Sequence, residues 1–200
     1  MTAKISKAIK LSFLGAMIAA VGFSVCYVRA HPLVFNESFF GHAHCWKMAD
    51  GYLAQYAQEH GGRFPFHTNG YGDAILLIPD VWLGCFSGPG YNTRAWEEAR
   101  KTGGNVPEDQ CGRVYVQGLS STNDPGIVLL FDKIPTAGDH KHSFGRIGAP
   151  LVREVVTIGG VDIIPESEWP AMCKRQIELL VAAGIASDQA ESYYSEKVKK

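Results

Sequence analysis

Residues 36–65 read NESFFGHAHCWKMADGYLAQYAQEHGGRFP, and the predicted fold is organised around this stretch. Its apolar residues recur mostly three or four positions apart, which is the spacing of one buried helix face. Asn36 and Ser38 are both suited to cap the start of a helix. Gly61-Gly62 favours a left-handed ending, and Pro65 prevents continuation. The stretch therefore predicts one long amphipathic helix.

The rest of the chain favours short strands and further helices. Residues 113–118 (RVYVQG) and 127–133 (IVLLFDK) predict two strands, and Gly159-Gly160 separates two more in a hairpin. Helices are expected over residues 93–101, over residues 167–183 and from Ser187. The predicted fold class is α+β, with a long N-terminal spine helix packed on a small antiparallel sheet and with C-terminal helices.

The N-terminus carries a targeting signal. Lys4, Lys7 and Lys10 precede residues 11–28 (LSFLGAMIAAVGFSVCYV), which contain no charged residue. Eighteen such residues are at the short end of what crosses a bilayer as a helix, and the lysines favour the cytoplasmic side. Residues 1–30 are therefore predicted to be a membrane anchor, and residues 31–200 an extracytoplasmic domain, in the periplasm or at the cell surface.

A cleaved signal peptide is the alternative. Val28 and Ala30 occupy the −3 and −1 positions of a potential cleavage site after Ala30. Cleavage there would make the domain a secreted protein. Both interpretations place residues 31–200 outside the cytoplasm.

The charge balance argues against a nucleic-acid partner. The chain has 19 basic and 20 acidic residues, and four of the basic ones lie in residues 1–30, which contain no acid. The remainder is thus mildly acidic, whereas a nucleic-acid surface needs a basic stripe. The expected partners are the membrane, through residues 11–28, and other proteins.

Three tracts resemble the type IV pilins and the pseudopilins of type II secretion. These are Leu53–Pro65 (LAQYAQEHGGRFP), Tyr115–Asp132 with its Y-V-Q-G-L-S and L-L-F-D ends, and the hairpin around Gly159-Gly160. The resemblance implies a pilin-like head domain with a binding or assembly role.

The N-terminal segment departs from that family's pattern. Gly22-Phe23 lies inside the apolar run, and Tyr27 stands where a processed prepilin would carry Glu. His31-Pro32 also interrupts a continuous helix. The resemblance therefore implies a pilin-like head on an ordinary anchor.

Cysteine pairing is left open by the sequence. Cys45, Cys85, Cys111 and Cys173 lie beyond the apolar segment, and four cysteines allow three pairings. Cys85 and Cys111 are the disulfide candidates, because a bond there would close a loop of about 25 residues and stabilise by a few kcal/mol. Buried thiols are the alternative.

The candidate metal ligands are His44, Cys45, Asp139, His140 and His142. Imidazole, thiolate and carboxylate groups together suit zinc or copper. His42 and His44 cannot share one ion on a helix, because positions two apart point about 200° away from each other. A site would form if the loop carrying His140 and His142 lay over the start of the helix.

Other sites have weaker sequence support. The loop Asn69–Asp73, together with Asp132 and Asp139, is a calcium candidate, but it lacks the regular acidic spacing of calcium loops. His67, Asp73 and Ser87 can be drawn as a triad, yet no G-x-S-x-G motif is present. The sequence favours a binding or scaffolding protein without cofactor or catalysis. The alternative is a metal-binding protein or enzyme that uses His140 and His142.

Overall fold

The computed structural model describes residues 42–88, 93–137 and 150–195. These residues form an α+β domain with an antiparallel sheet and several helices. The helices are α3 (His42–Glu59), α4 (Tyr71–Leu76), α5 (Gly84–Ser87), α6 (Arg94–Thr102), the short 3-10 helix η1 (Glu108–Gln110), α7 (Trp169–Ala182) and α8 (Ser187–Tyr194). The strands are β1 (Arg113–Tyr115), β2 (Val128–Asp132), β3 (Thr136–Ala137), β4 (Leu151–Thr157) and β5 (Gly160–Pro165).

The sheet is four strands wide within the described residues. On β4, Val155 pairs with both β2 and β5, and Val152 pairs with both β3 and β5. A strand has only two edges, so β2 and β3 lie end to end along one edge of β4 and β5 lies along the other. β1 pairs with β2, and all the pairings are antiparallel. The order across the sheet is therefore β1, β2 with β3, β4 and β5.

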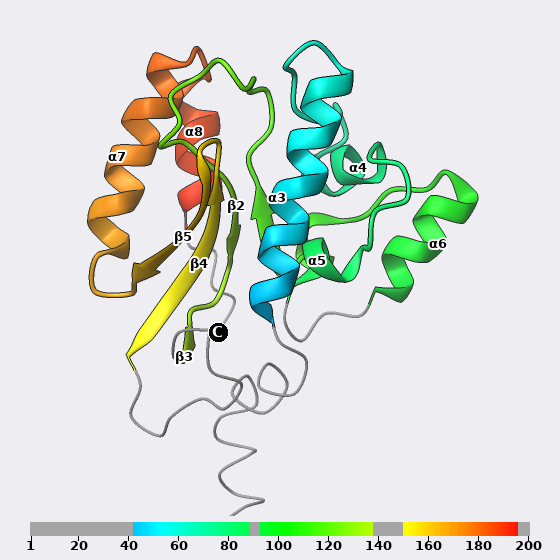
Figure 1. Ribbon diagram of the computed structural model, residues 1–200, viewed down its shortest axis with the longest axis horizontal. Helices are drawn as coiled ribbons and strands as arrows, with labels where there is room; N and C mark the ends of the chain where they lie inside the picture. The colour runs from blue at the N-terminus through cyan, green and yellow to red at the C-terminus, as the bar shows by residue number, and fades with distance from the viewer. Residues whose placement is uncertain (1–41, 89–92, 138–149, 196–200) are drawn as a thin grey trace, which may run out of the picture.

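Helices cover both faces of this sheet (Figure 1). On one face the Phe131 ring centroid lies 5.1 Å from those of Trp169 in α7 and Tyr194 in α8. On the other face the Arg113 guanidinium lies under the Trp46 ring of α3. Every residue of β2 is buried, because both of its faces are covered. The sheet is the middle layer of three.

This arrangement contradicts the predicted fold class. The prediction gave one long spine helix laid on a small sheet in the manner of a pilin. α3 has 18 described residues, and residues 36–41, where the helix was expected to begin, lie outside the described part. α3 is one element of a helical layer with α4, α5 and α6, and a second layer of α7 and α8 covers the opposite face (Figure 1). The pilin-like arrangement is wrong because the apolar surface of the sheet requires cover on two sides.

Several local predictions are confirmed. The hairpin at residues 159–160 forms between β4 and β5, and the helices at residues 93–101 and 167–183 appear as α6 and α7. The end of α3 has Gly61 and Gly62 at φ 64° and 86°. The following backbone then pairs with the turn after β1, where Phe64 N–H donates to the Leu119 carbonyl at 3.1 Å. The apolar run at residues 74–78 lies mainly in α4.

Candidate functional site

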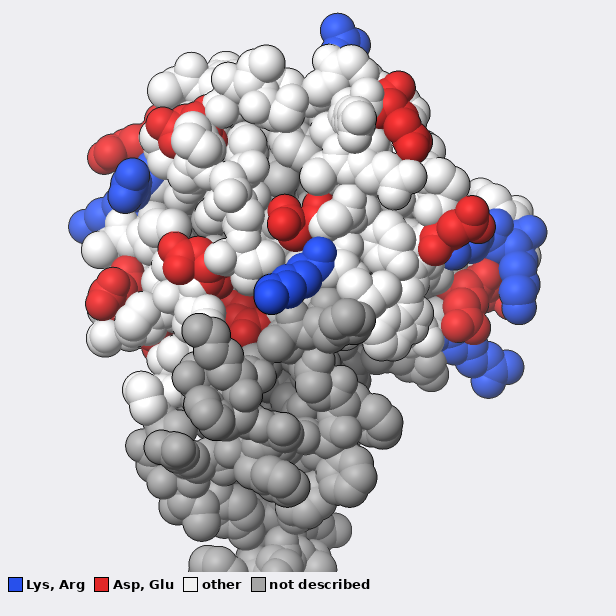
Figure 2. All heavy atoms as spheres, viewed as in Figure 1, with Lys and Arg blue, Asp and Glu red and all other residues white. Residues whose placement is uncertain are grey.

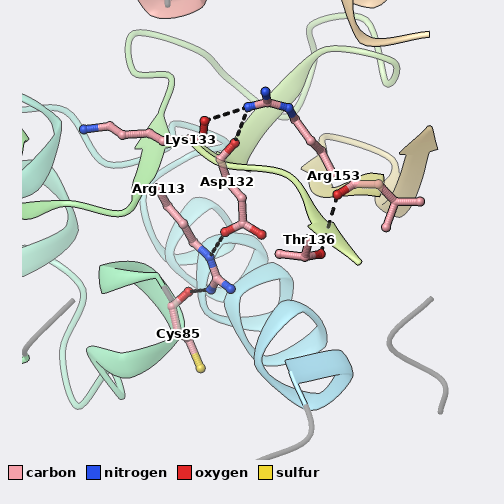
Figure 3. A network of polar contacts seen from close by, with 7 residues as sticks. Cys85, Arg113, Asp132, Lys133, Thr136 and Arg153 are labelled. Atoms are coloured by element: carbon pink, nitrogen blue, oxygen red, sulfur yellow. Dashed lines mark hydrogen bonds and ion pairs between the residues drawn. The ribbon is translucent and has the colours of Figure 1, made fainter. Parts of the chain in front are cut away.

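A buried ion pair connects the sheet to α3 and α5. Arg113 Nε on β1 donates to Asp132 Oδ1 on β2 at 2.8 Å, and both residues are 1% exposed. The Arg113 Nη1 also donates to the Cys85 carbonyl of α5, and the guanidinium carbon lies 3.9 Å from the centre of the Trp46 ring. Figure 3 shows the Arg113 guanidinium between the Asp132 carboxylate and the Cys85 carbonyl. One arginine thus holds together two strands and two helices.

A second arginine, Arg153, binds the backbone at the end of β2. Arg153 Nη1 donates to the carbonyls of Asp132 and Lys133, at 3.0 and 2.8 Å. Its Nε and Nη2 bind the Glu166 carboxylate at 2.8 and 2.9 Å, and its guanidinium carbon lies 4.7 Å from the centre of the Trp169 ring. Figure 3 shows Arg153 reaching the backbone that leaves β2. Arg153 thus fixes the course of the backbone from the protein interior, and Glu166 binds it from a partly exposed position.

Two thiols meet where α3 contacts α5. Cys45 and Cys85 are 6% and 0% exposed, and a side-chain hydrogen bond between them contributes to the pKa of Cys85. This hydrogen bond and burial both raise the pKa of Cys85, against a smaller lowering by Arg113. Because the thiol form of Cys85 is favoured, Cys85 is not an activated nucleophile.

Cys111 lies apart from this pair. Its thiol donates to the Pro107 carbonyl at 3.5 Å, and burial raises its pKa to about 12. All four described cysteines carry thiols, so the proposed Cys85–Cys111 disulfide is not formed in the structure. That pairing stays a prediction.

The predicted metal ligands are only partly described. Cys45 lies beside Cys85, whereas Asp139, His140, His142 and the side chain of His44 lie outside the described residues. Within residues 42–88, 93–137 and 150–195, no three His, Cys, Asp or Glu side chains are grouped to hold a metal ion. The zinc or copper site stays a prediction.

The calcium candidates are engaged elsewhere. Asp73 Oδ1 accepts the Val106 N–H at 2.7 Å, and Asp132 binds Arg113. Asp139 lies outside the described residues. Asp73 and Asp132 thus each serve a separate structural contact.

Of the notional triad, only two members approach each other. His67 Nδ1 lies 3.7 Å from Asp73 Oδ2, and it also accepts the Asn69 N–H at 3.2 Å. Ser87 is buried in α5, and its carbonyl accepts the Gly112 N–H. Because His67 Nδ1 accepts the Asn69 N–H, it has no proton to donate to Asp73, and the 3.7 Å approach is not a hydrogen bond.

The connection from α3 to α5 carries exposed apolar side chains. Phe66, Leu77 and Trp82 are 54%, 43% and 53% exposed, and we call residues 66–82 the 66–82 segment. The backbone on both sides of Phe66 is fixed, because Pro65 O accepts the Tyr115 hydroxyl at 2.9 Å and His67 N–H donates to Gln117 at 3.0 Å. The backbone at Phe66 is thus held in place, and its side chain is mostly exposed to solvent.

Trp82 is likewise held in position. Its indole lies against the backbone of Gly84, where an added Cβ would be 3.2 Å from the ring. The Trp82 carbonyl accepts the Cys85 N–H at 3.0 Å, at the start of α5. Ordered, exposed aromatic side chains of this kind are enriched at the centres of protein interfaces.

Charge on the visible surface is mixed. Figure 2 shows acidic and basic side chains interspersed over the described part of one face, with large uncharged areas between them. No helix within the described ranges has the length and apolar character to cross a membrane, and residues 11–28 lie outside those ranges. Comparison of the chain with protein-family models, with curated proteins and with solved structures finds no match.

Proposed function

We propose that the chain is a membrane-anchored extracytoplasmic protein with a binding or scaffolding role. Residues 1–30 would anchor it, and the domain in residues 31–200 would present the 66–82 segment to a protein partner. The relation to pilins and pseudopilins belongs to this proposal at the level of the sequence tracts alone. The spine-and-sheet arrangement forms no part of it.

The observation that carries the proposal is the fixed exposure of Phe66 and Trp82. Burying one such side chain from water is worth about 1.5–3 kcal/mol. A partner would not have to order the backbone here first, because hydrogen bonds at residues 65, 67 and 82 already fix it. The 66–82 segment is therefore prepared for contact with an apolar pocket of another protein.

The buried charges support a scaffold. Arg113, Asp132 and Arg153 bind one another's strands and the flanking helices. These charges favour one arrangement of the layers, because any other arrangement would leave a buried charge without its partner. A rigid body of this kind suits a protein that presents a surface.

Site-specific crosslinking in cells tests the contact surface. A photo-reactive phenylalanine analogue is placed at position 66 or 82 of the full chain, and at Val181 of α7, which is 45% exposed, as the matched control. We expect discrete protein adducts at positions 66 and 82 that Val181 does not give. Trp82→Ala should weaken the adduct formed at position 66. Identical adducts at all three positions, or adducts with lipid alone, would overturn the proposed protein contact.

Location is tested separately. We expect the full chain to fractionate with membranes, to be cut by protease added outside the cytoplasmic membrane, and to lose membrane association when residues 1–30 are deleted. Intact mass distinguishes anchoring from cleavage after Ala30. A domain protected from external protease would refute the extracytoplasmic location.

A further inference from the structure

The contact between α3 and α5 brings together two cysteines that are 40 positions apart in the chain. Cys45 lies in the first described turns of α3, Cys85 lies in α5, and both side chains are buried in the same apolar core. Other contacts hold the same two helices together. The Tyr52 and Phe86 ring centroids are 6.4 Å apart, and Arg113 joins Trp46 to the Cys85 carbonyl. These contacts fix α3 against α5, and the two cysteines are neighbours as a result.

From this geometry we infer that Cys45 and Cys85 form a disulfide in the mature protein and link the start of α3 to α5. The inference rests on the proposed extracytoplasmic location, because disulfides persist in oxidising compartments. It also selects one of the pairings that the sequence left open.

The oxidant is a protein or small-molecule disulfide. The thiolate of one cysteine attacks that disulfide, which forms a mixed disulfide and releases one thiolate of the oxidant. The thiolate of the second cysteine then attacks the sulfur of the first, forms the Cys45–Cys85 bond and releases the second thiolate of the oxidant. The two thiol protons end on the oxidant, which gains two electrons and becomes a dithiol or two thiols. Because Cys85 is fully buried, exchange precedes the closure of α5 on α3, during folding or local opening.

The other described cysteines are less suitable partners. The Cys111 thiol donates to the Pro107 carbonyl. Cys173 lies on α7, in the layer on the opposite face of the sheet (Figure 1). Of the described cysteines, Cys45 is the one whose side-chain hydrogen bond raises the pKa of the Cys85 thiol. The structure thus favours Cys45–Cys85 over Cys85–Cys111.

The bond would have a defined consequence for the 66–82 segment. The loop closed by Cys45 and Cys85 contains the rest of α3 and the 66–82 segment, which includes α4. Figure 1 shows α5 beside the N-terminal half of α3. A covalent link there would hold the exposed Phe66 and Trp82 between two fixed points.

Thiol trapping on the full chain tests the inference. Cells are quenched in acid, and the protein is denatured, alkylated and analysed by intact mass and peptide mapping. We expect two fewer alkylated thiols than in a reduced sample, and a linked peptide that contains Cys45 and Cys85. Cys111→Ala should keep the linked peptide, whereas Cys45→Ala and Cys85→Ala should lose it. A Cys85–Cys111 peptide would overturn the inference.

A second arm separates the geometry from the location. The purified full chain, reduced in detergent, is exposed to an oxidised dithiol. Cys45–Cys85 should form in this arm even if the protease test places the domain in the cytoplasm, in which case the proposed location fails and the pairing stands. Reduction should lower the melting temperature of the oxidised wild-type chain and of Cys111→Ala by roughly 5–15 °C, but not that of Cys45→Ala. If all thiols remain alkylatable in both arms, the inference is wrong.

Discussion

Arg113 and Asp132 face each other across β1 and β2, with Nε 2.8 Å from Oδ1, and both side chains are enclosed by the sheet and α3. The pair brings two opposite charges into the interior at a point where two strands and two helices meet. Each charge compensates the other, so removing one of them measures what the pair contributes to the free energy of unfolding.

Arg113→Met should lower the free energy of unfolding by about 3–5 kcal/mol, because Asp132 would be left as an uncompensated buried charge. The double variant Arg113→Met with Asp132→Leu should recover part of this loss, since no charge remains in the interior. Urea unfolding followed by circular dichroism measures both. Arg175→Met, at an exposed position on α7, is the control and should change stability by less than about 0.5 kcal/mol. An Arg113→Met loss no larger than the control would show that the pair is dispensable.

The Gln176 side chain joins α7 to the sheet through hydrogen bonds. Its Oε1 accepts the Val128 N–H at 2.9 Å, and its Nε2 donates to the Gly126 carbonyl at 2.8 Å, in a fully buried position. Gln176→Leu should lower the free energy of unfolding by about 2–4 kcal/mol, since both backbone groups would lose their partner. Gln58→Leu on the exposed side of α3 is the matched control. Equal unfolding midpoints for the two variants would contradict the assigned role.

Two helical glycines should respond oppositely to alanine. A Cβ on Gly72 of α4 would lie 2.6 Å from the Val106 carbonyl oxygen, so Gly72→Ala should lower stability by about 1–3 kcal/mol. A Cβ on Gly51 of α3 would meet nothing within 4 Å, so Gly51→Ala should raise stability by up to about 1 kcal/mol. Thermal unfolding of the two variants gives the signs. A destabilising Gly51→Ala would mean that α3 packs differently.

Alkaline pH should destabilise the reduced chain partly through Cys111. Burial raises the pKa of Cys111 in the folded protein from 9.0 to about 12. Its contribution to stability is complete below pH 9, where both states hold the proton, and declines between pH 9 and 12 because the unfolded thiol ionises first. The decline is about 1.4 kcal/mol per pH unit for one group.

Between pH 9 and 12 the free energy of unfolding should therefore fall less steeply with pH in Cys111→Ala than in the wild-type chain. The difference in slope should correspond to the release of about one proton. The two curves should run parallel between pH 6 and 8, which serves as the internal control. Urea titrations at fixed pH under a phosphine reductant measure the slopes. Equal slopes above pH 9 would show that the Cys111 thiol is accessible to solvent in the folded chain.

Local pattern was sufficient for the longer helices and strands, whereas α4, α5, η1 and β3 were not predicted. Gly61-Gly62 ends α3, and Gly159 and Gly160 lie at the turn of the hairpin between β4 and β5, because these signals act over a few residues. The layer arrangement was not predicted. The run IVLLF at residues 127–131 is apolar at successive positions rather than alternating, which indicates a strand covered on both faces. Attention to that signal would have predicted helices on both sides of the sheet.

The site was harder to predict than the elements. Arg113 and Asp132 look like ordinary charged residues at the ends of two strands, and only the antiparallel register places them opposite each other. Cys45 was a metal candidate because it follows His44, yet its described neighbour is Cys85, 40 positions away. The spacing of residues along the chain does not predict this contact, because the contact depends on how α3 and α5 pack.

The sequence by itself determined the α+β class, the charge-free segment 11–28, the hairpin and the ends of most helices, since each follows from short-range periodicity and turn chemistry. Tertiary structure decided that two helical layers enclose the sheet, that Arg113 pairs with Asp132, that Cys45 meets Cys85, and that Phe66 and Trp82 face solvent. These depend on which distant surfaces exclude water together, and burial is a property of the packed chain rather than of any one stretch.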